Sequence, residues 1–350
     1  MSTRTTASDE FCSRFGLRYP IVQAPMAGVT TPELVAAVAG AGGLGSLGAA
    51  YLSPQALREQ LLAVRRLTTA AFKVNLFLGH SPNTATLAPA HAALAATRGD
   101  LSLPDEIPGS PWQPDVHAQV EVLLEQRVPI VSFMFGVPEP ALMSLLHDAG
   151  IAVWGNAISV EDAQRLADAG CDAVVLQGVG AGGHRATFSP ADDGDGLDTS
   201  ALVEAAARQI SVPLIAAGGL MDGHDLLSVI ERGAVAGQFG TAFLDTDEAG
   251  TREPHRAALR SAGELPRLTR AFSGRPARAL PNRFTNAAEA QAWPLADFPI
   301  QNALTQPIRR AGAERGDAEV MALWAGVGVS RLRQMPAAQI VACLAEEAWP

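Results

Sequence analysis

The chain has 350 residues, of which 48% are hydrophobic and 18% charged, and its formal net charge is −10. The acidic balance and the lack of a basic stripe disfavour a nucleic-acid partner. No run of about 18 uncharged apolar residues is present that would cross a membrane. Three widely spaced cysteines without a C-x-x-C motif argue against a zinc site. Because the N-terminus also lacks the apolar core of a signal peptide, we expect a cytoplasmic protein that uses no metal.

The first part of the chain alternates between apolar runs and helical patterns. Residues 1–9 are polar, and we expect them to be disordered. A short helix is predicted from Asp9 to Gly16, and Thr31-Pro32-Glu33 supplies the N-cap, proline and acid that begin another. We predict strands at residues 21–24, 43–48 and 71–78, and helices at residues 33–41 and 54–67.

Residues 79–118 interrupt this alternation. They contain six prolines and no strong strand pattern. We interpret them as an insertion on the rim of the fold.

The alternation resumes with a helix at residues 116–126. Strands are then predicted at residues 129–135, 152–156, 173–177, 212–217 and 236–244, with helices between them. These strands are apolar throughout, which indicates parallel pairing with both faces buried. Eight such strands predict a (β/α)8 TIM barrel, while a doubly wound open sheet is the rival that would rarely need eight evenly spaced units.

The pattern changes again after residue 244. We predict a barrel domain at residues 10–250, including the insertion, and a mostly helical region at residues 251–350. The second region would cover the barrel mouth, and its last helix, Ala337–Glu347, would pack back on the barrel.

Candidate functional residues lie at the ends of the predicted strands, where barrels of this class build their sites. The residues at those ends are Ala24, Pro25, Met26, Asn75, Gln177, Gly182, Gly183, His184, Gly218, Gly219, Gln238, Gly240 and Thr241. The most informative stretch runs from Val174 to Thr187, where an apolar strand stops at Gln177 and leads through small residues to His184.

Two glycine-containing pairs follow the seventh and eighth predicted strands: Gly218-Gly219 and Gly240-Thr241. Either pair alone is typical of an ordinary turn. Together they predict a phosphate site, because backbone N–H groups after these two strands commonly bind phosphate and glycine permits close approach. The Thr241 hydroxyl would add a donor.

Asn75 and Gln177 are amides at the ends of apolar strands. Each is either a satisfied buried amide or a partner for a polar ring system such as a flavin. His184 is either a structural residue or a reactive one that moves a proton or stabilises an anion. Arg185 is expected to anchor the loop or a neighbouring carboxylate.

The chain resembles the nitronate monooxygenases, formerly called 2-nitropropane dioxygenases, from about residue 12 to residue 345. The segments that carry the resemblance are YPIVQAPMAGVTTPELVAAVAGAGGLGSLGA, FKVNLFL, SFMFGVP, LQGVGAGGHR, IAAGGLMDG, GQFGTAFL, TRAFSGRPARAL and FPIQNALTQPIRR. Any one of them is shared with related flavin barrels, but together they are specific.

The resemblance implies a bound FMN and the oxidation of alkyl nitronates, such as propionate 3-nitronate, by O2 to a carbonyl compound and nitrite. It implies FMN contacts at Ala24, Pro25, Met26, Asn75, Gln177, Gly182, Gly219, Gln238, Phe239, Gly240 and Thr241, with His184 near the nitro group. Many members carry an acid at the position of Gly180 and a glycine at that of Ala186, so the orientation of His184 stays open.

Two other functions remain open. An NAD(P)H-dependent flavin reductase of the enoyl-carrier-protein or quinone reductase type could use the same barrel and a similar glycine-histidine loop. A non-catalytic flavin-binding protein is the third reading, which the presence of His184 disfavours. The sequence leaves the oligomeric state open, and a homodimer is compatible with it.

Overall fold

The computed structural model describes residues 4–79 and 81–350. Eight parallel strands form its central sheet, in the spatial order β1-β9-β8-β6-β5-β4-β3-β2. In chain order these strands are β1 (Ile21–Gln23), β2 (Gly45–Gly48), β3 (Phe72–Phe77), β4 (Ile130–Met134), β5 (Ala152–Ala157), β6 (Ala173–Gln177), β8 (Leu214–Ala217) and β9 (Ala236–Phe239). A parallel bridge between Val22 and Leu44 joins β1 to β2. The sheet therefore closes on itself, so the predicted barrel is confirmed and the open-sheet rival is wrong.

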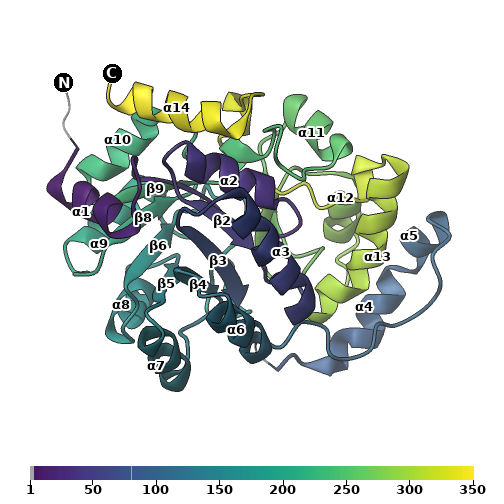
Figure 1. The fold of residues 1–350 in the computed structure, drawn as a ribbon. Coiled ribbons are helices and arrows are strands. Elements are labelled where there is room, and N and C mark those ends of the chain that lie inside the picture. The colour runs from purple at the N-terminus through teal and green to yellow at the C-terminus, as the bar shows by residue number, and fades with distance from the viewer. Residues whose placement is uncertain (1–3, 80) are drawn as a thin grey trace.

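Helices surround this barrel (Figure 1). They are α2 (Pro32–Gly40), α3 (Pro54–Leu67), α6 (Val116–Glu125), α7 (Pro140–Asp148), α8 (Val160–Asp168), α9 (Thr199–Ala207), α10 (Gly223–Glu231) and α14 (Ala337–Ala348). The chain caps them locally: for example, the Thr31 side chain accepts from the Leu34 N–H at 3.0 Å. The C-terminal α14 lies against α10 and α2, where it completes the helical ring.

The N-terminal end of the barrel is closed by α1 (Thr6–Phe15). Its Phe11 and Phe15 rings lie 5.8 and 5.6 Å from the buried ring of Trp154 on β5. The expectation that residues 1–9 are disordered is wrong from Thr6 onward, because the Thr5 side chain caps the helix and its apolar face is buried. Residues 1–3 lie outside the described part of the chain.

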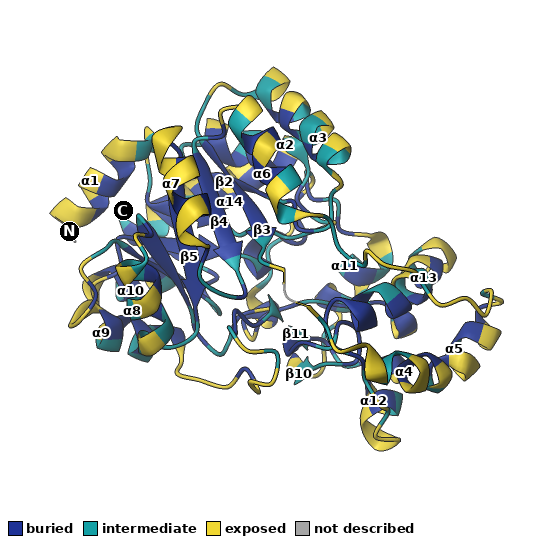
Figure 2. Ribbon diagram, turned by 90° about the horizontal axis from the view of Figure 1, so that it is seen from below, coloured by how far each residue is buried: buried dark blue, intermediate teal, exposed yellow. Residues whose placement is uncertain are grey.

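A second group of elements forms what we call the side lobe, which lies apart from the barrel in Figure 2. It comprises α4 (Leu87–Ala93), α5 (Ala95–Asp100), β10 (Arg267–Thr269), β11 (Ala277–Ala279), α12 (Arg283–Ala290) and α13 (Ile300–Arg315). Its own hydrophobic cluster joins Leu94 of the predicted insertion to Phe272 and Ile308. Residues from the insertion and from the C-terminal region thus share one core, while the division near residue 250 stays a prediction.

The side lobe is tied to the barrel by a three-stranded antiparallel sheet. Its β11 pairs with β10 on one side and with β7 (Gly183–His184) on the other. The β10 and β11 strands were missed in a region predicted to be mostly helical. The last barrel strand also ends earlier than predicted, because residues 241–243 form the 3-10 turn η2.

Among the described residues, no helix has both the length and the apolarity that a membrane span requires.

Candidate functional site

The loop that follows β6 is held by Arg185, as expected for an anchoring residue. The Arg185 side chain is fully buried and donates to the carbonyls of Gly178 and Gly194 at 2.6 and 2.7 Å. It also donates to Gln177 Oε1 at 2.9 Å, and Gln177 Nε2 donates to the His184 carbonyl at 2.9 Å. The Gln177 amide is therefore occupied in shaping the loop that presents His184.

Ser273 of the side lobe holds the imidazole of His184. The distance between His184 Nε2 and Ser273 Oγ is 2.9 Å, and Ser273 Oγ donates to the Arg275 carbonyl at 3.2 Å. Because the hydroxyl proton is used there, we assign the ring proton to Nε2, which leaves Nδ1 as the proton-accepting nitrogen. The loop carries glycine at position 180, so Ser273 supplies the orientation that the sequence left open.

Four aromatic rings surround His184. The centroids of Phe77, Phe135, Phe298 and Trp324 lie 5.9, 5.9, 6.1 and 5.5 Å from the imidazole centroid. Phe135 follows β4 with φ +76°, a strained conformation for a bulky residue, and such strain is common at functional sites. The rings shield the half-buried imidazole from part of the surrounding water, which strengthens electrostatic effects on it.

The charges near His184 are positive. Burial lowers the pKa of His184 to about 3, and the guanidinium groups of Arg275 and Arg309 lower it further in the same direction. Arg275 lies 4.0 Å above the Phe135 ring. Arg309 on α13 donates to Asn302 Oδ1 at 2.8 Å, while its Nε lacks a partner among the described residues. The imidazole is therefore neutral at physiological pH in a region that favours anions.

A strap formed by residues 324–328 covers the loop after β6. The Val327 N–H donates to the Gly180 carbonyl at 3.0 Å, and the Gly326 N–H donates to Thr241 Oγ1 at 2.9 Å. A Cβ on Gly182 would lie 2.5 Å from the backbone of Ala325 and Gly326. Glycine is thus required at position 182 by the strap, a reason that the sequence did not reveal.

The glycine pairs after β8 and β9 carry unused backbone donors. Gly218 and Gly219 have φ values of +111° and +75°, which favour glycine. Among the described residues, no acceptor is paired with the backbone N–H groups of Gly218, Gly219, Gly240 or Thr241. Gly218, Gly219 and Gly240 are half-buried and Thr241 is buried, and backbone donors in such places are seldom left unpaired, so these four groups are suited to bind an anion such as phosphate.

Two further amides point into the barrel interior. Asn75 accepts from the Ser132 hydroxyl through Oδ1 at 2.8 Å, and Gln238 accepts from Lys73 Nζ through Oε1 at 2.5 Å. Both residues are buried. In the described part of the chain, neither amide NH2 group has a protein acceptor, so both are available to a bound ring.

The remaining predicted site residues, Ala24, Pro25 and Met26, lie in the loop that follows β1. Ala24 follows β1, and its N–H donates to the Phe239 carbonyl at 2.8 Å. The Met26 N–H donates to Thr30 Oγ1 at 3.2 Å, which folds the loop that begins with Pro25. These contacts bring the ends of β1 and β9 together.

The sequence-based search missed the aromatic and charged residues of the site. Phe77, Phe135 and Tyr51, whose ring lies 5.6 Å from that of Phe77, lie at or just after the ends of β3, β4 and β2, so counting aromatic residues there would have found them. Ser273, Arg275, Phe298 and Arg309 come from the side lobe. Their only signal was their position in segments that carry the family resemblance.

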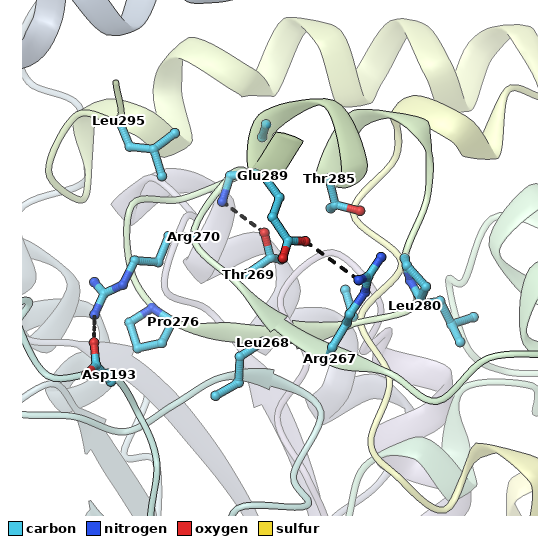
Figure 3. A pocket seen from close by; sticks show the side chains of 14 residues that line it. Asp193, Arg267, Leu268, Thr269, Arg270, Pro276, Leu280, Thr285, Glu289 and Leu295 are labelled. Carbon is cyan, nitrogen blue, oxygen red and sulfur yellow. Dashed lines mark hydrogen bonds and ion pairs between the residues drawn. The ribbon is translucent and has the colours of Figure 1, made fainter. Parts of the chain in front are cut away.

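An open pocket of about 320 Å³ lies elsewhere, between β10 and α12 (Figure 3). Arg267 and Glu289 face each other there at 3.6 Å, and Arg270 reaches Asp193 at 3.8 Å. The Arg270 contact fastens an acidic turn in which Asp193 is exposed. None of the predicted site residues lines this pocket.

Asp222, His224 and Glu347 form a cluster whose ligand-type atoms lie within 4.8 Å of one another. Arg331 pairs with Asp222 at 2.9 Å, and Arg333 pairs with Glu347 at 2.7 Å. Internal ion pairs therefore account for this cluster.

Comparisons with known proteins agree with this geometry. Residues 10–347 match the family described as nitronate monooxygenase. A "Probable nitronate monooxygenase" of Staphylococcus aureus strain MSSA476 is 37% identical over 93% of each chain, and one of strain Newman is 38% identical over 89% of this chain and 88% of the relative.

Two solved structures are also similar. A nitroalkane oxidase from Streptomyces ansochromogenes has a TM-score of 0.90 and 40% identity, with 97% of each chain covered. FabK from Thermotoga maritima has a TM-score of 0.77 and 27% identity, with 99% of this chain and 96% of that chain covered.

Proposed function

The chain belongs to the nitronate monooxygenase family of oxidoreductases, and we propose that it uses bound FMN to oxidise alkyl nitronates, such as propionate 3-nitronate, with O2. Overall, two nitronates and one O2 would give two carbonyl compounds and two nitrite ions, so that each nitronate carbon gains one oxygen atom and loses its nitrogen as nitrite. A carbonyl compound and nitrite are then released in equal amounts.

The observation that carries this proposal is the electrostatic setting of His184. A nitronate is an anion that has already lost its α-proton, so it needs no strong base. An imidazole with a pKa of about 3 is a poor base toward a neutral nitroalkane. The same two guanidinium groups that keep His184 neutral, those of Arg275 and Arg309, attract an anion. We therefore expect nitronates to be preferred over neutral nitroalkanes.

The residues present fit FMN. The phosphate would accept from the unpaired N–H groups of Gly218, Gly219, Gly240 and Thr241. The NH2 groups of Asn75 and Gln238 would donate to acceptors on the flavin ring. Gly183 leaves open space beside the loop, since a Cβ there would meet no atom within 4 Å. When bound, FMN supplies the electron transfer between nitronate and oxygen.

This chain's own residues would supply the rest of the reaction site. The imidazole of His184 would lie against the substrate, with Ser273 fixing the ring through Nε2. The four surrounding aromatic rings would exclude water from the reacting atoms. Trp324 comes from the strap, so the strap contributes to the site wall.

The test has two arms on the purified protein. In air, propionate 3-nitronate should give nitrite without any nicotinamide, and the protein should carry FMN that is released on denaturation. In a second arm without oxygen, NADH and NADPH should leave the flavin spectrum unchanged. Rapid flavin bleaching by either nucleotide, with no nitrite from the nitronate, would contradict the proposal.

That contrary outcome would favour an NAD(P)H-dependent flavin reductase, the alternative to which the likeness to FabK gives some support. Bound FMN with neither activity would favour a non-catalytic flavin-binding protein. The combined outcomes of the two arms therefore distinguish these three functions.

A further inference from the structure

Lys73 is the only lysine of the chain, whose other 25 basic residues, histidines aside, are all arginines. It lies on β3 and is fully buried. Its side chain reaches across the barrel interior to Gln238 on β9. A lone ammonium inside a barrel is unfavourable unless something compensates for its lost hydration.

The contacts of Lys73 compensate for that loss only in part. Its Nζ donates to Gln238 Oε1 at 2.5 Å and lies 5.0 Å above the Trp154 ring. Among the described residues, no carboxylate forms an ion pair with it. Burial lowers the pKa of Lys73 to about 7, and burial is the only cause of this shift. The buried Lys73 ammonium therefore lowers the free energy of unfolding substantially.

The hydrogen bond from Lys73 decides how the Gln238 amide is turned. Ammonium donates and never accepts, so only the oxygen of the amide can face it. The Gln238 NH2 group then points elsewhere and has no acceptor in the described part of the chain. Gln238 lies two residues before Gly240 and three before Thr241, so its free donor is next to the proposed FMN site.

We infer that Lys73 is a positioning residue for the flavin: it would turn the Gln238 amide so that its NH2 group can donate to the bound ring, and it would place a positive charge near that ring. This inference rests on the proposed function. Reduction adds electrons to the ring, so a nearby cation and a fixed donor both favour the reduced form. Lysine suits this role better than arginine, because ammonium is a compact charge that fits inside a barrel.

The first test compares the FMN-loaded wild-type protein with its Lys73→Met variant. The wild-type protein should bind reduced FMN more tightly, relative to oxidised FMN, than the variant does. We expect this affinity ratio to fall by about tenfold in the variant, which corresponds to a decrease of about 30 mV in the two-electron midpoint potential. The control is Arg165→Met. Arg165 lies 4.9 Å above the Phe188 ring on the outside of the barrel, so removing that cation should leave the potential unchanged.

A second measurement needs no variant. Protein labelled with 15N-lysine contains a single side-chain nitrogen signal, that of Lys73, and this signal should shift when bound FMN is reduced. An unchanged potential in Lys73→Met, or a signal insensitive to reduction if that variant fails to fold, would overturn the inference. Nitrite formation from the nitronate, measured on the same wild-type sample, would still support the proposed function in that case. A protein without FMN and without nitrite would overturn both.

Discussion

The barrel and the side lobe reach the region around His184 by different means. From the barrel come backbone N–H groups at the ends of β8 and β9 and short amides in its interior. From the side lobe come long side chains, Ser273, Arg275 and Arg309. The closed sheet of the barrel fixes backbone groups in place, whereas the separately packed side lobe can bring charged side chains over the barrel mouth.

This difference suggests a division of labour. The barrel would bind the cofactor and present the histidine, and the side lobe would orient the histidine and attract the substrate. Each variant below changes one side of this comparison and leaves the other intact.

The largest effect is expected from His184→Asn. His184 would position the nitronate and not take its proton, and a misplacement of the reacting atoms can cost about 100-fold in rate, so nitrite formation should fall by about that factor. FMN content should persist, since the cradle of backbone donors is unchanged. The matched control is His117→Asn, which alters an exposed histidine on α6. Full activity in His184→Asn would show that the side lobe surrounds a merely structural residue.

Lys73→Met should raise the free energy of unfolding even as it alters the flavin potential. The folded pKa of about 7 lies below the ordinary value of 10.5, so the unfolded state binds more protons between these limits. Wild-type stability should therefore rise with pH from about 7 to 10.5, and the variant should lack this rise. Near pH 7 the variant should be more stable by about 4 kcal/mol.

Urea unfolding of both proteins from pH 6 to pH 10, at one FMN concentration, measures this difference. A constant gap across the pH range would mean that Lys73 does not titrate in the folded barrel. Burial would then not destabilise the charged form of Lys73.

Arg309→Met tests the substrate-attracting role of the side lobe. Losing one of two nearby cations should raise KM for propionate 3-nitronate about tenfold, with a smaller effect on a neutral nitroalkane. It should also raise the pKa of His184, since Arg309 is one of the causes that lower it. Steady-state kinetics with both substrates at about pH 7 measure the change in KM, and the NMR signals of the His184 ring, followed down to about pH 4, measure the shift in its pKa. Arg310→Met, a change at the exposed neighbouring arginine, is the control. Equal losses for the charged and neutral substrates would contradict the proposed division.

Sequence alone was informative about the barrel because its strands are uniformly apolar and regularly spaced. The same reasoning placed Gly218 and Gly219 directly after a barrel strand and His184 in the loop after β6, and the structure has them there, while their roles in binding and catalysis stay predictions. It could not locate Ser273 or Arg309, since their positions depend on packing between α4 and α13, elements about 200 residues apart. Nor could it identify Lys73, because only the closed barrel brings β3 and β9 close enough for that side chain to reach Gln238.

Ser273→Ala should have the smallest effect, and it tests the contact between the two regions most directly. The variant removes the hydroxyl that accepts from His184 Nε2 and leaves the imidazole among its four aromatic neighbours. A single neutral hydrogen bond contributes about 0.5–1.5 kcal/mol, so kcat should fall about 3- to 10-fold. KM should hardly change, because Arg275 and Arg309 still attract the anion. The control is Ser261→Ala, which removes an exposed hydroxyl bonded only to the Ala257 carbonyl. A loss as large as that of His184→Asn would mean that Ser273 takes part in the chemistry, whereas an unchanged kcat would mean that the aromatic rings alone orient the histidine.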